Sequence, residues 1–338
     1  MGGIWTSADD FYEALTEVIG IKSGLIVEKK DLRELLQQDP QLEAYSDLQA
    51  GLFRIRSEVF EAVVEFLLYK VGVLERPFNP VPVGILYHRY KRNKKKLDLA
   101  MEISSQFTNF LEGAIEKAKA APERVLDPIP FIEAMSAKFG AEGLEMALML
   151  VESLHVQLVR NPWGPNSLEY DDPIHLKDLF ENEGLNPMFG KFIDQRYIDF
   201  LHRNFEAIDR INWRKFEGLT AEFFDRAGFR VALGAGRNDD GIDVRVWPAS
   251  NLGEVPPAII VQCKRQKATV EKVVVKALYA DVLAEGAKSG LIVTTARLSR
   301  GARKVCVARE YPISEADRSS LRDWIKRLRS PGAGWLLS

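Results

Sequence analysis

The stretch that decides the fold is Ala258-Ile259-Ile260-Val261-Gln262-Cys263-Lys264. It begins with apolar residues and ends with polar ones, which predicts a buried central strand whose last residues reach the edge of a sheet. Side chains two residues apart on a strand share a face, so Gln262 and Lys264 point the same way and Cys263 points the opposite way. The sequence therefore predicts that an amide and an ammonium leave one strand end together.

Further helices and strands are predicted on both sides of this stretch. Asn212 is a plausible N-cap for a helix that Gly228 would end. The remaining predicted elements are a strand at 229–233, a strand through Ile242, Val244 and Val246, a helix at about 270–285, a strand at 290–295, a helix that Ser299 caps, and a last helix with Ser314 and Asp317 as a capping box. This alternation of helices and strands predicts an α/β domain at residues 206–338.

Residues 1–205 show a different pattern. Apolar residues return there at intervals of three and four, as in the segments 53–67 and 97–115, and a helix pair is predicted at about 129–139 and 141–160. We therefore predict an all-α helical domain at 1–205. A chain of 338 residues is long enough for two domains. The predicted fold class is thus α+β with two domains.

Composition and charge exclude several classes of protein. The chain is 46% hydrophobic and 28% charged, which is typical of a packed protein rather than a disordered one. Residues 1–205 sum to −9 and residues 206–338 to +7, which together give the net charge of −2. The basic C-terminal part suggests that a polyanion is bound there.

Cysteine and histidine usage excludes other classes. Two cysteines and four scattered histidines fit neither a disulfide framework nor a structural zinc site. There is no apolar run long enough to cross a bilayer and no signal peptide pattern, so we expect a cytoplasmic protein without a membrane partner.

Four polar residues form the informative constellation. Glu217 lies on the first predicted helix of the C-terminal domain, Asp243 on the second strand, and Gln262 and Lys264 on the third. If the two strands are neighbours, Asp243 lies beside Gln262 and Lys264. Such a group suits phosphodiester hydrolysis with Mg²⁺ (or Mn²⁺), in which Asp243, Gln262 and Glu217 hold the metal and Lys264 orients the attacking water. The alternative is a solvated strand end joined by a salt bridge.

At these residues the sequence resembles the Mrr-type restriction endonuclease domain, a branch of the PD-(D/E)xK nuclease superfamily. The matching motifs are Phe216-Glu217, Asp239-Asp240-Gly241-Ile242-Asp243, Val261-Gln262-Cys263-Lys264-Arg265, and Gly290–Thr295 followed by Ser299 and Ala302. The resemblance covers about residues 210–330. It implies a mixed central sheet flanked by helices, catalytic roles for Asp243 and Lys264, Gln262 in place of the second acidic ligand, and Glu217 as a helix-borne acid.

The resemblance also leads to a functional prediction. We expect a Mg²⁺-dependent DNA endonuclease of restriction or anti-phage defence type. Making a double-strand break needs two sites or two successive nicks, which favours a homodimer or higher homo-oligomer. Residues 1–205 would form a recognition, sensing or assembly domain that binds the target, a protein or another partner. The alternatives are a nuclease specific for DNA structure, such as a junction or end, and a non-catalytic DNA-binding or assembly module that keeps the nuclease fold; RNA as substrate also stays open.

Several basic residues are candidates for contact with nucleic acid. Arg265 and Lys267 follow the predicted catalytic lysine, and the run from Arg89 to Lys96 is the most basic segment of the N-terminal part. The candidates are Arg265, Lys267, Lys91, Arg92 and Lys94. Basic residues interleaved with Tyr90 could bind a phosphate backbone, although a solvated helix start would have the same composition.

Overall fold

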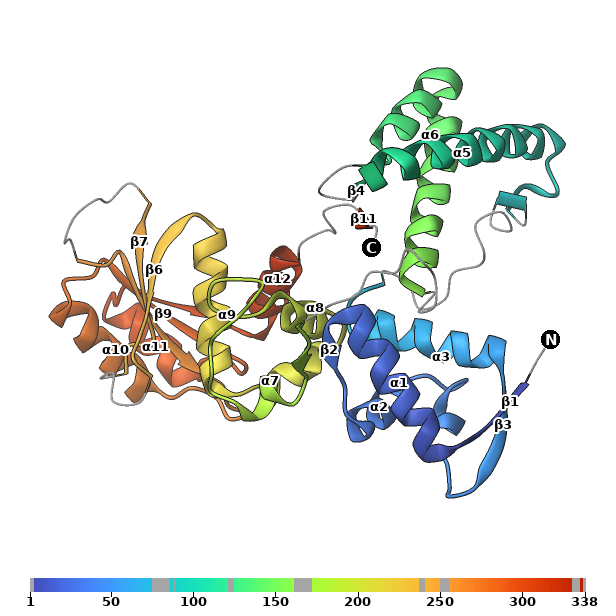
Figure 1. Ribbon diagram of the computed structural model, residues 1–338. Coiled ribbons are helices and arrows are strands. Elements are labelled where there is room, and N and C mark those ends of the chain that lie inside the picture. The colour runs from blue at the N-terminus through green and yellow to red at the C-terminus, as the bar shows by residue number, and fades with distance from the viewer. Residues whose placement is uncertain are drawn as a thin grey trace. The chain divides into compact units, whose positions relative to one another are not determined.

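The structure is a computed structural model that describes residues 3–74, 86–87, 89–120, 125–160, 172–236, 241–249, 256–329 and 335–336. The chain divides into two compact units, each described here by itself (Figure 1). Unit 1 comprises Met1–Ile174 and Pro331–Ser338, and unit 2 comprises His175–Ser330. This division falls earlier in the chain than the boundary at 205/206 that the sequence predicts. None of the described helices is both long and apolar enough to cross a membrane.

Unit 1 is mainly helical. Its elements are β1 (Gly3–Ser7), α1 (Ala8–Ser23), β2 (Leu25–Ile26), α2 (Lys29–Leu36), a short 3₁₀ helix (Glu43–Tyr45), β3 (Leu52–Arg56), α3 (Ser57–Lys70), α5 (Lys94–Ala120), β4 (Val125–Leu126), α6 (Ile129–Arg160) and β11 (Trp335–Leu336). Gly140 breaks the helical geometry inside α6, with φ of 62°, so the break predicted between 129–139 and 141–160 is confirmed.

The prediction of an all-α domain at 1–205 is wrong. β1 pairs with β3 in antiparallel fashion, β4 pairs with β11, and β2 pairs with β5 (Ile174–His175). Each of these strands is short and gains its hydrogen bonds from a segment far away in the sequence. Hydrophobic periodicity over a local window detects the long helices and misses such strands.

Unit 2 contains a five-stranded sheet in the order β10-β9-β8-β7-β6. After β5, its elements are α7 (Asp178–Glu181), α8 (Gln195–Arg203), a 3₁₀ helix (Phe205–Asp209), α9 (Trp213–Arg226), β6 (Phe229–Leu233), β7 (Val244–Pro248), β8 (Ile259–Lys264), α10 (Lys272–Ala284), β9 (Ser289–Thr294), α11 (Arg300–Ala308), β10 (Ile313–Ala316) and α12 (Arg318–Leu328). β6, β7 and β8 are antiparallel, whereas β8, β9 and β10 are parallel. The predicted mixed sheet is therefore confirmed.

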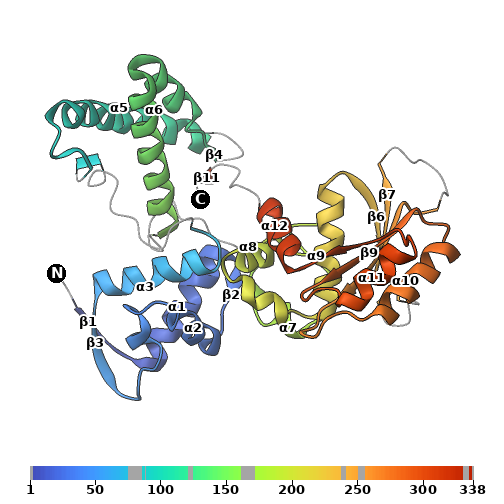
Figure 2. The ribbon, with the colours of Figure 1, turned by 180° about the vertical axis from the view of Figure 1, so that it is seen from behind.

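Helices cover both faces of this sheet (Figure 2). On one face, Ile260 and Ile292 form a buried core with Val275 and Leu278 of α10 and Ala302 of α11. α9 contacts β6, β7 and β8, and α12 lies against α9. β8 is central and buried, as its apolar sequence predicts, and its polar end emerges beside α9.

The local signals for helix starts are confirmed at two positions and wrong at a third. The side chains of Asn212 and Ser299 accept backbone hydrogen bonds at the starts of α9 and α11. Ser314 is not part of a capping box, because it lies in β10, where it pairs with Leu291 of β9. Asp317 caps α12 itself by accepting hydrogen bonds from the backbone of its first turn. Pairing with β9 thus makes Ser314 part of a strand, although the local sequence resembles a helix cap.

Asp194 anchors the segment that precedes α8. Its side chain is 4% exposed, accepts hydrogen bonds from Arg196 Nε at 2.8 Å and Nη2 at 3.0 Å, and also accepts from the backbone of Met188 and Phe189. Burial alone would raise the pKa of Asp194, but the hydrogen bonds and charge of Arg196 outweigh burial and leave the pKa lowered. The ionised form is therefore the one that the fold stabilises.

We expect Asp194→Ala to lower the free energy of unfolding of unit 2 by about 3 kcal/mol at pH 7, because it leaves Arg196 buried without this partner. Because folding lowers the pKa, the contribution of Asp194 is complete above its unfolded pKa of about 3.9 and is lost as pH falls through the folded value. Urea denaturation should therefore show a gap between wild type and variant that closes in acid. Asp225→Ala, which removes the surface ion pair with Lys191, is the control, and we expect it to cost less than about 1 kcal/mol. Equal losses for the two variants would contradict this assignment.

Candidate active site

Asp243 lies immediately before β7, and hydrogen bonds of its own backbone hold it in place. Its N–H donates to the Val261 carbonyl at 3.0 Å, and its carbonyl accepts from Gly234 N at 2.8 Å. Asp243 is 8% exposed, and its Oδ2 accepts a hydrogen bond from Cys263 N at 2.5 Å. Main-chain contacts to β8 and to the end of β6 thus fix one carboxylate at the edge of the sheet.

Glu217 of α9 brings a second carboxyl group to Asp243. It is 5% exposed, and its Oε2 accepts from Arg214 Nη1 at 2.7 Å. Burial raises the pKa of Glu217 to about 8; the Arg214 hydrogen bond opposes this shift, and the charge of Asp243 adds to it. The Glu217 and Asp243 carboxyl groups therefore lie close together, and the raised pKa of Glu217 favours its protonated form.

Gln262 of β8 follows Val261, which pairs with Val244 next to Asp243, and it carries a buried acceptor. The residue is 7% exposed, and its Oε1 accepts no hydrogen bond from any residue that the structure describes. Its Nε2 lies near Gly241, where an added Cβ would come within 3.1 Å of it, and Gly241 has φ of +83°. A side chain at 241 would therefore strain the backbone and crowd Gln262. A buried acceptor that has no partner among the described residues calls for an explanation, and a ligand is one.

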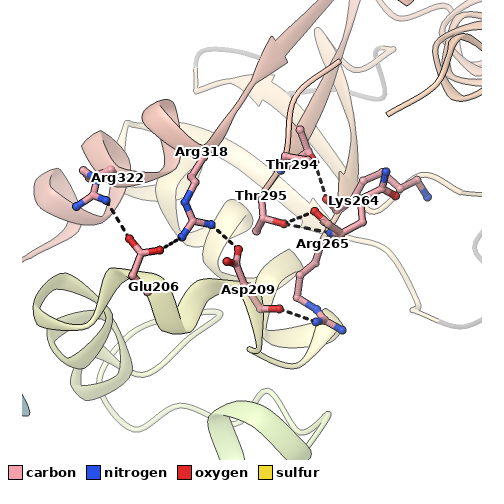
Figure 3. A network of polar contacts seen from close by, with 10 residues as sticks. Glu206, Asp209, Lys264, Arg265, Thr294, Thr295, Arg318 and Arg322 are labelled. Carbon is pink, nitrogen blue, oxygen red and sulfur yellow. Dashed lines mark hydrogen bonds and ion pairs between the residues drawn. The ribbon is translucent and has the colours of Figure 1, made fainter. Parts of the chain in front are cut away.

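Lys264 is the last residue of β8, and its side chain lies on the same face of the strand as that of Gln262, two residues earlier. Its carbonyl accepts from Thr294 Oγ1 of β9 at 2.7 Å, which fixes the backbone (Figure 3). The side chain is half-buried. The structure thus brings Glu217 to Asp243, and it places Gln262 and Lys264 near the end of the neighbouring strand β8.

A known family of proteins resembles this region. Residues 208–325 match the Mrr_cat restriction endonuclease family. The match covers less than half of the chain and confirms the resemblance predicted from sequence at about residues 210–330. We refer to this region as the Mrr_cat region.

A solved structure titled "MspJI Restriction Endonuclease in Complex with 27-mer Oligonucleotide" is also similar. It is 23% identical, the similarity covers 39% of this chain and 30% of that chain, and the TM-score is 0.28. The similarity therefore spans less than a third of that protein's length and is too low to bear on fold or function. No curated protein matches the chain.

The Mrr_cat region contains supporting residues that the sequence analysis did not identify. Arg214 binds Glu217 and also donates through Nη2 to the Gly234 carbonyl at 2.8 Å, so it links α9 to the loop after β6. The spacing of three residues between Arg214 and Glu217 on one helix was a signal that could have identified this pair. The Cys263 N–H could not have been found in this way, because its contact with Asp243 depends on the register of two strands.

The loop after Lys264 is held by polar contacts on both sides (Figure 3). Arg265 donates through Nη1 to the Asp209 carbonyl at 2.9 Å. Arg318 of α12 forms ion pairs with Asp209 and Glu206. Thr295 Oγ1 donates to the Gln266 carbonyl at 3.0 Å and accepts from the Gln266 N–H. Arg265 therefore serves the fold of the Mrr_cat region, and its exposed side chain also stays a candidate for DNA contact.

The remaining basic candidates are exposed. Lys267 lies in the loop after β8, and Lys91, Arg92 and Lys94 lie at the turn that begins α5 in unit 1. The ends of the basic run are used within unit 1, since Arg89 pairs with Glu145 at 2.5 Å and Lys96 with Glu142 at 3.0 Å. Asp239 and Asp240 lie outside the described residues.

Proposed function

We propose that this chain is an endonuclease that hydrolyses phosphodiester bonds of DNA in restriction or anti-phage defence. The observation that carries the proposal is the approach of the Glu217 and Asp243 carboxyl groups beside the end of β8, the strand of Gln262 and Lys264, within the region that matches the Mrr_cat family. Two carboxyl groups, a buried amide and a nearby lysine form a donor set suited to a hard cation and a phosphate.

The residues present fit a divalent cation. Gln262 offers a buried oxygen that has no partner among the described residues. Burial raises the pKa of Glu217 to about 8, and the negative charge of Asp243 adds to this shift. A cation bound beside Glu217 and Asp243 would offset the repulsion between the two carboxylates. Asp243, Gln262 and Glu217 would hold Mg²⁺ or Mn²⁺. Such an ion, when bound, neutralises phosphate charge and lowers the pKa of a water molecule.

The other groups of the site act on substrate and water directly. The Lys264 ammonium orients the attacking water and stabilises the extra negative charge that develops on the phosphate. Arg214 keeps the Glu217 carboxyl directed toward Asp243. The Cys263 N–H holds Asp243 in one orientation, so the carboxylate is preorganised before substrate binds.

Two further features extend the proposal. A double-strand break requires two sites or two successive nicks, so we propose that two or more copies act together, with unit 1 recognising the target or a partner. The homo-oligomer and the cytoplasmic location stay predictions from the sequence.

Incubation of the purified chain with DNA tests the proposal. We expect supercoiled plasmid to be nicked or linearised with Mg²⁺ or Mn²⁺ and to stay intact with EDTA, as read from agarose gels. A branched junction and an RNA of matched sequence are the comparison substrates. If only the junction is cut, the chain is a structure-specific nuclease; if no substrate is cut by a preparation that binds DNA, the catalytic proposal is wrong.

A further inference from the structure

β1 and β3 form a two-stranded ribbon at the start of unit 1. Their register places Trp5 opposite Arg54, Gly3 opposite Arg56 and Ser7 opposite Leu52. Directly opposed residues of an antiparallel pair share a face. One face of the ribbon therefore carries Gly3, Trp5, Ser7, Leu52, Arg54 and Arg56, and we call it the Trp5 face.

The opposite face of the ribbon is the one that packs on unit 1. Ile55 is 3% exposed, and the Phe53 ring meets Phe11 of α1 edge to face at 5.7 Å. The Trp5 face consequently points outward: Trp5 is 67% exposed and Leu52 is 72% exposed. An apolar side chain as large as tryptophan that the fold leaves in water is a feature of binding surfaces.

The charges of the Trp5 face have one sign. The strands Gly3–Ser7 and Leu52–Arg56 contain two arginines, both exposed, and no acidic residue. Arg54 lies across Gly3, since a Cβ added there would come within 2.5 Å of its Nε. Glycine at position 3 thus leaves room for the guanidinium to lie on the outward surface, directly across the ribbon from Trp5.

Two acids follow the first strand of the ribbon. Asp9 and Asp10 follow β1 in the first turn of α1. Asp9 forms an ion pair with Lys29, and Asp10 accepts a hydrogen bond from Ser7. The strands of the ribbon thus carry two arginines and no acid, with Asp10 bonded at its Ser7 end, although residues 1–205 together sum to −9.

We propose that the Trp5 face binds duplex DNA, an inference that rests on the proposed function. A two-stranded antiparallel ribbon has the width that the major groove of B-DNA admits. Arg54 and Arg56 supply contacts to phosphates or guanine edges, and Trp5 supplies apolar contact to the groove. DNA is favoured over an acidic protein because the same chain carries a region that matches a restriction endonuclease family.

Fluorescence anisotropy with a labelled duplex of about two helical turns tests this inference on the full chain in EDTA. We expect Trp5→Ala and Arg54→Ala each to weaken binding about 10-fold, with Trp5→Phe recovering part of the loss. Arg54→Ala should also reduce the slope of log affinity against log salt by about 0.9 for each phosphate that its guanidinium neutralises. Duplex RNA of the same sequence should be bound weakly and should be insensitive to these changes, because its major groove is narrow.

Two matched controls separate the face from the ribbon as a whole. Ile4→Ala removes a side chain that is 59% exposed on the same strand but on the opposite face, and Lys30→Ala removes an exposed positive charge on α2. We expect both to bind DNA like wild type, and we expect all variants to keep the wild-type melting temperature because none of the side chains is buried.

The inference would be overturned if both controls lost as much DNA affinity as Trp5→Ala and Arg54→Ala do. It would also be overturned if none of the variants changed the DNA affinity. This result is independent of the plasmid assay. If the wild-type chain cleaves DNA and the Trp5-face variants bind DNA as wild type does, only the present inference is wrong. If the Trp5-face variants specifically lose DNA binding and the wild-type chain cleaves no DNA, only the catalytic proposal is wrong.

Discussion

Replacing Asp243 with Asn is expected to slow DNA cleavage by about 10³-fold or more, because several kcal/mol of transition-state stabilisation depend on its charge. The fold should survive this change. Asn is close in shape to Asp, and its Oδ1 can still accept the Cys263 N–H that holds Asp243 Oδ2 at 2.5 Å. Single-turnover cleavage of plasmid with Mg²⁺ measures the rate, and anisotropy in EDTA measures DNA affinity, which should stay within about 3-fold of wild type because the substitution removes a negative charge rather than a phosphate contact.

Asp323→Asn is the matched control for this experiment. Asp323 is an exposed acid on α12 of the same unit, so its substitution changes the net charge by the same amount. We expect its cleavage rate to equal that of wild type. Cleavage by Asp243→Asn at the wild-type rate would show that the two carboxyl groups are a buried structural pair and would remove the site from the mechanism.

The C-terminal region was largely predictable because its signals are local. The apolar run before Gln262 predicts β8, and Asn212 and Ser299 cap the helices that they were expected to cap. Strand alternation places Gln262 and Lys264 on one face without knowledge of their neighbours. These features depend on short segments of chain, and sequence reports them directly.

The features that sequence did not predict depend on long-range pairing. β1 and β3 lie about fifty residues apart in the chain, and each is too short to show a convincing alternation. Ser314 resembles a helix cap until β9 supplies a parallel partner for its strand. A local pattern cannot reveal which distant strand will satisfy its backbone groups.

The candidate site was predictable in composition and not in geometry. The strands β7 and β8 are neighbours, as the sequence analysis required, and Glu217 and Asp243 come together beside the end of β8. The direct approach of Glu217 to Asp243 required the position of α9 on the sheet. Lys264 ends β8, the strand whose Cys263 N–H binds Asp243, so it lies at the strand end where the sequence predicts it.

The role of Lys264 leads to the second large effect. We expect Lys264→Met to lower the single-turnover cleavage rate by about 10²–10³-fold, because the substitution removes the positive charge at the end of β8 that we propose stabilises the developing phosphate charge. Met keeps most of the apolar stem, and the Thr294 contact that fixes this residue is made to the carbonyl of 264 and does not depend on its side chain. DNA affinity and melting temperature should therefore change little.

Two further variants distinguish this role from a general electrostatic one. Lys267→Met removes an exposed lysine from the loop after β8, and we expect it to weaken DNA binding by a few-fold at most while the rate at saturating enzyme stays that of wild type. Lys264→Arg keeps the charge but replaces a compact ammonium with a larger planar group, so we expect it to stay at least about 10-fold slower than wild type. A Lys264→Met enzyme that cleaves at the wild-type rate once DNA is saturating would place this lysine in binding alone, because a group that acts on the transition state must change the rate of the bound complex.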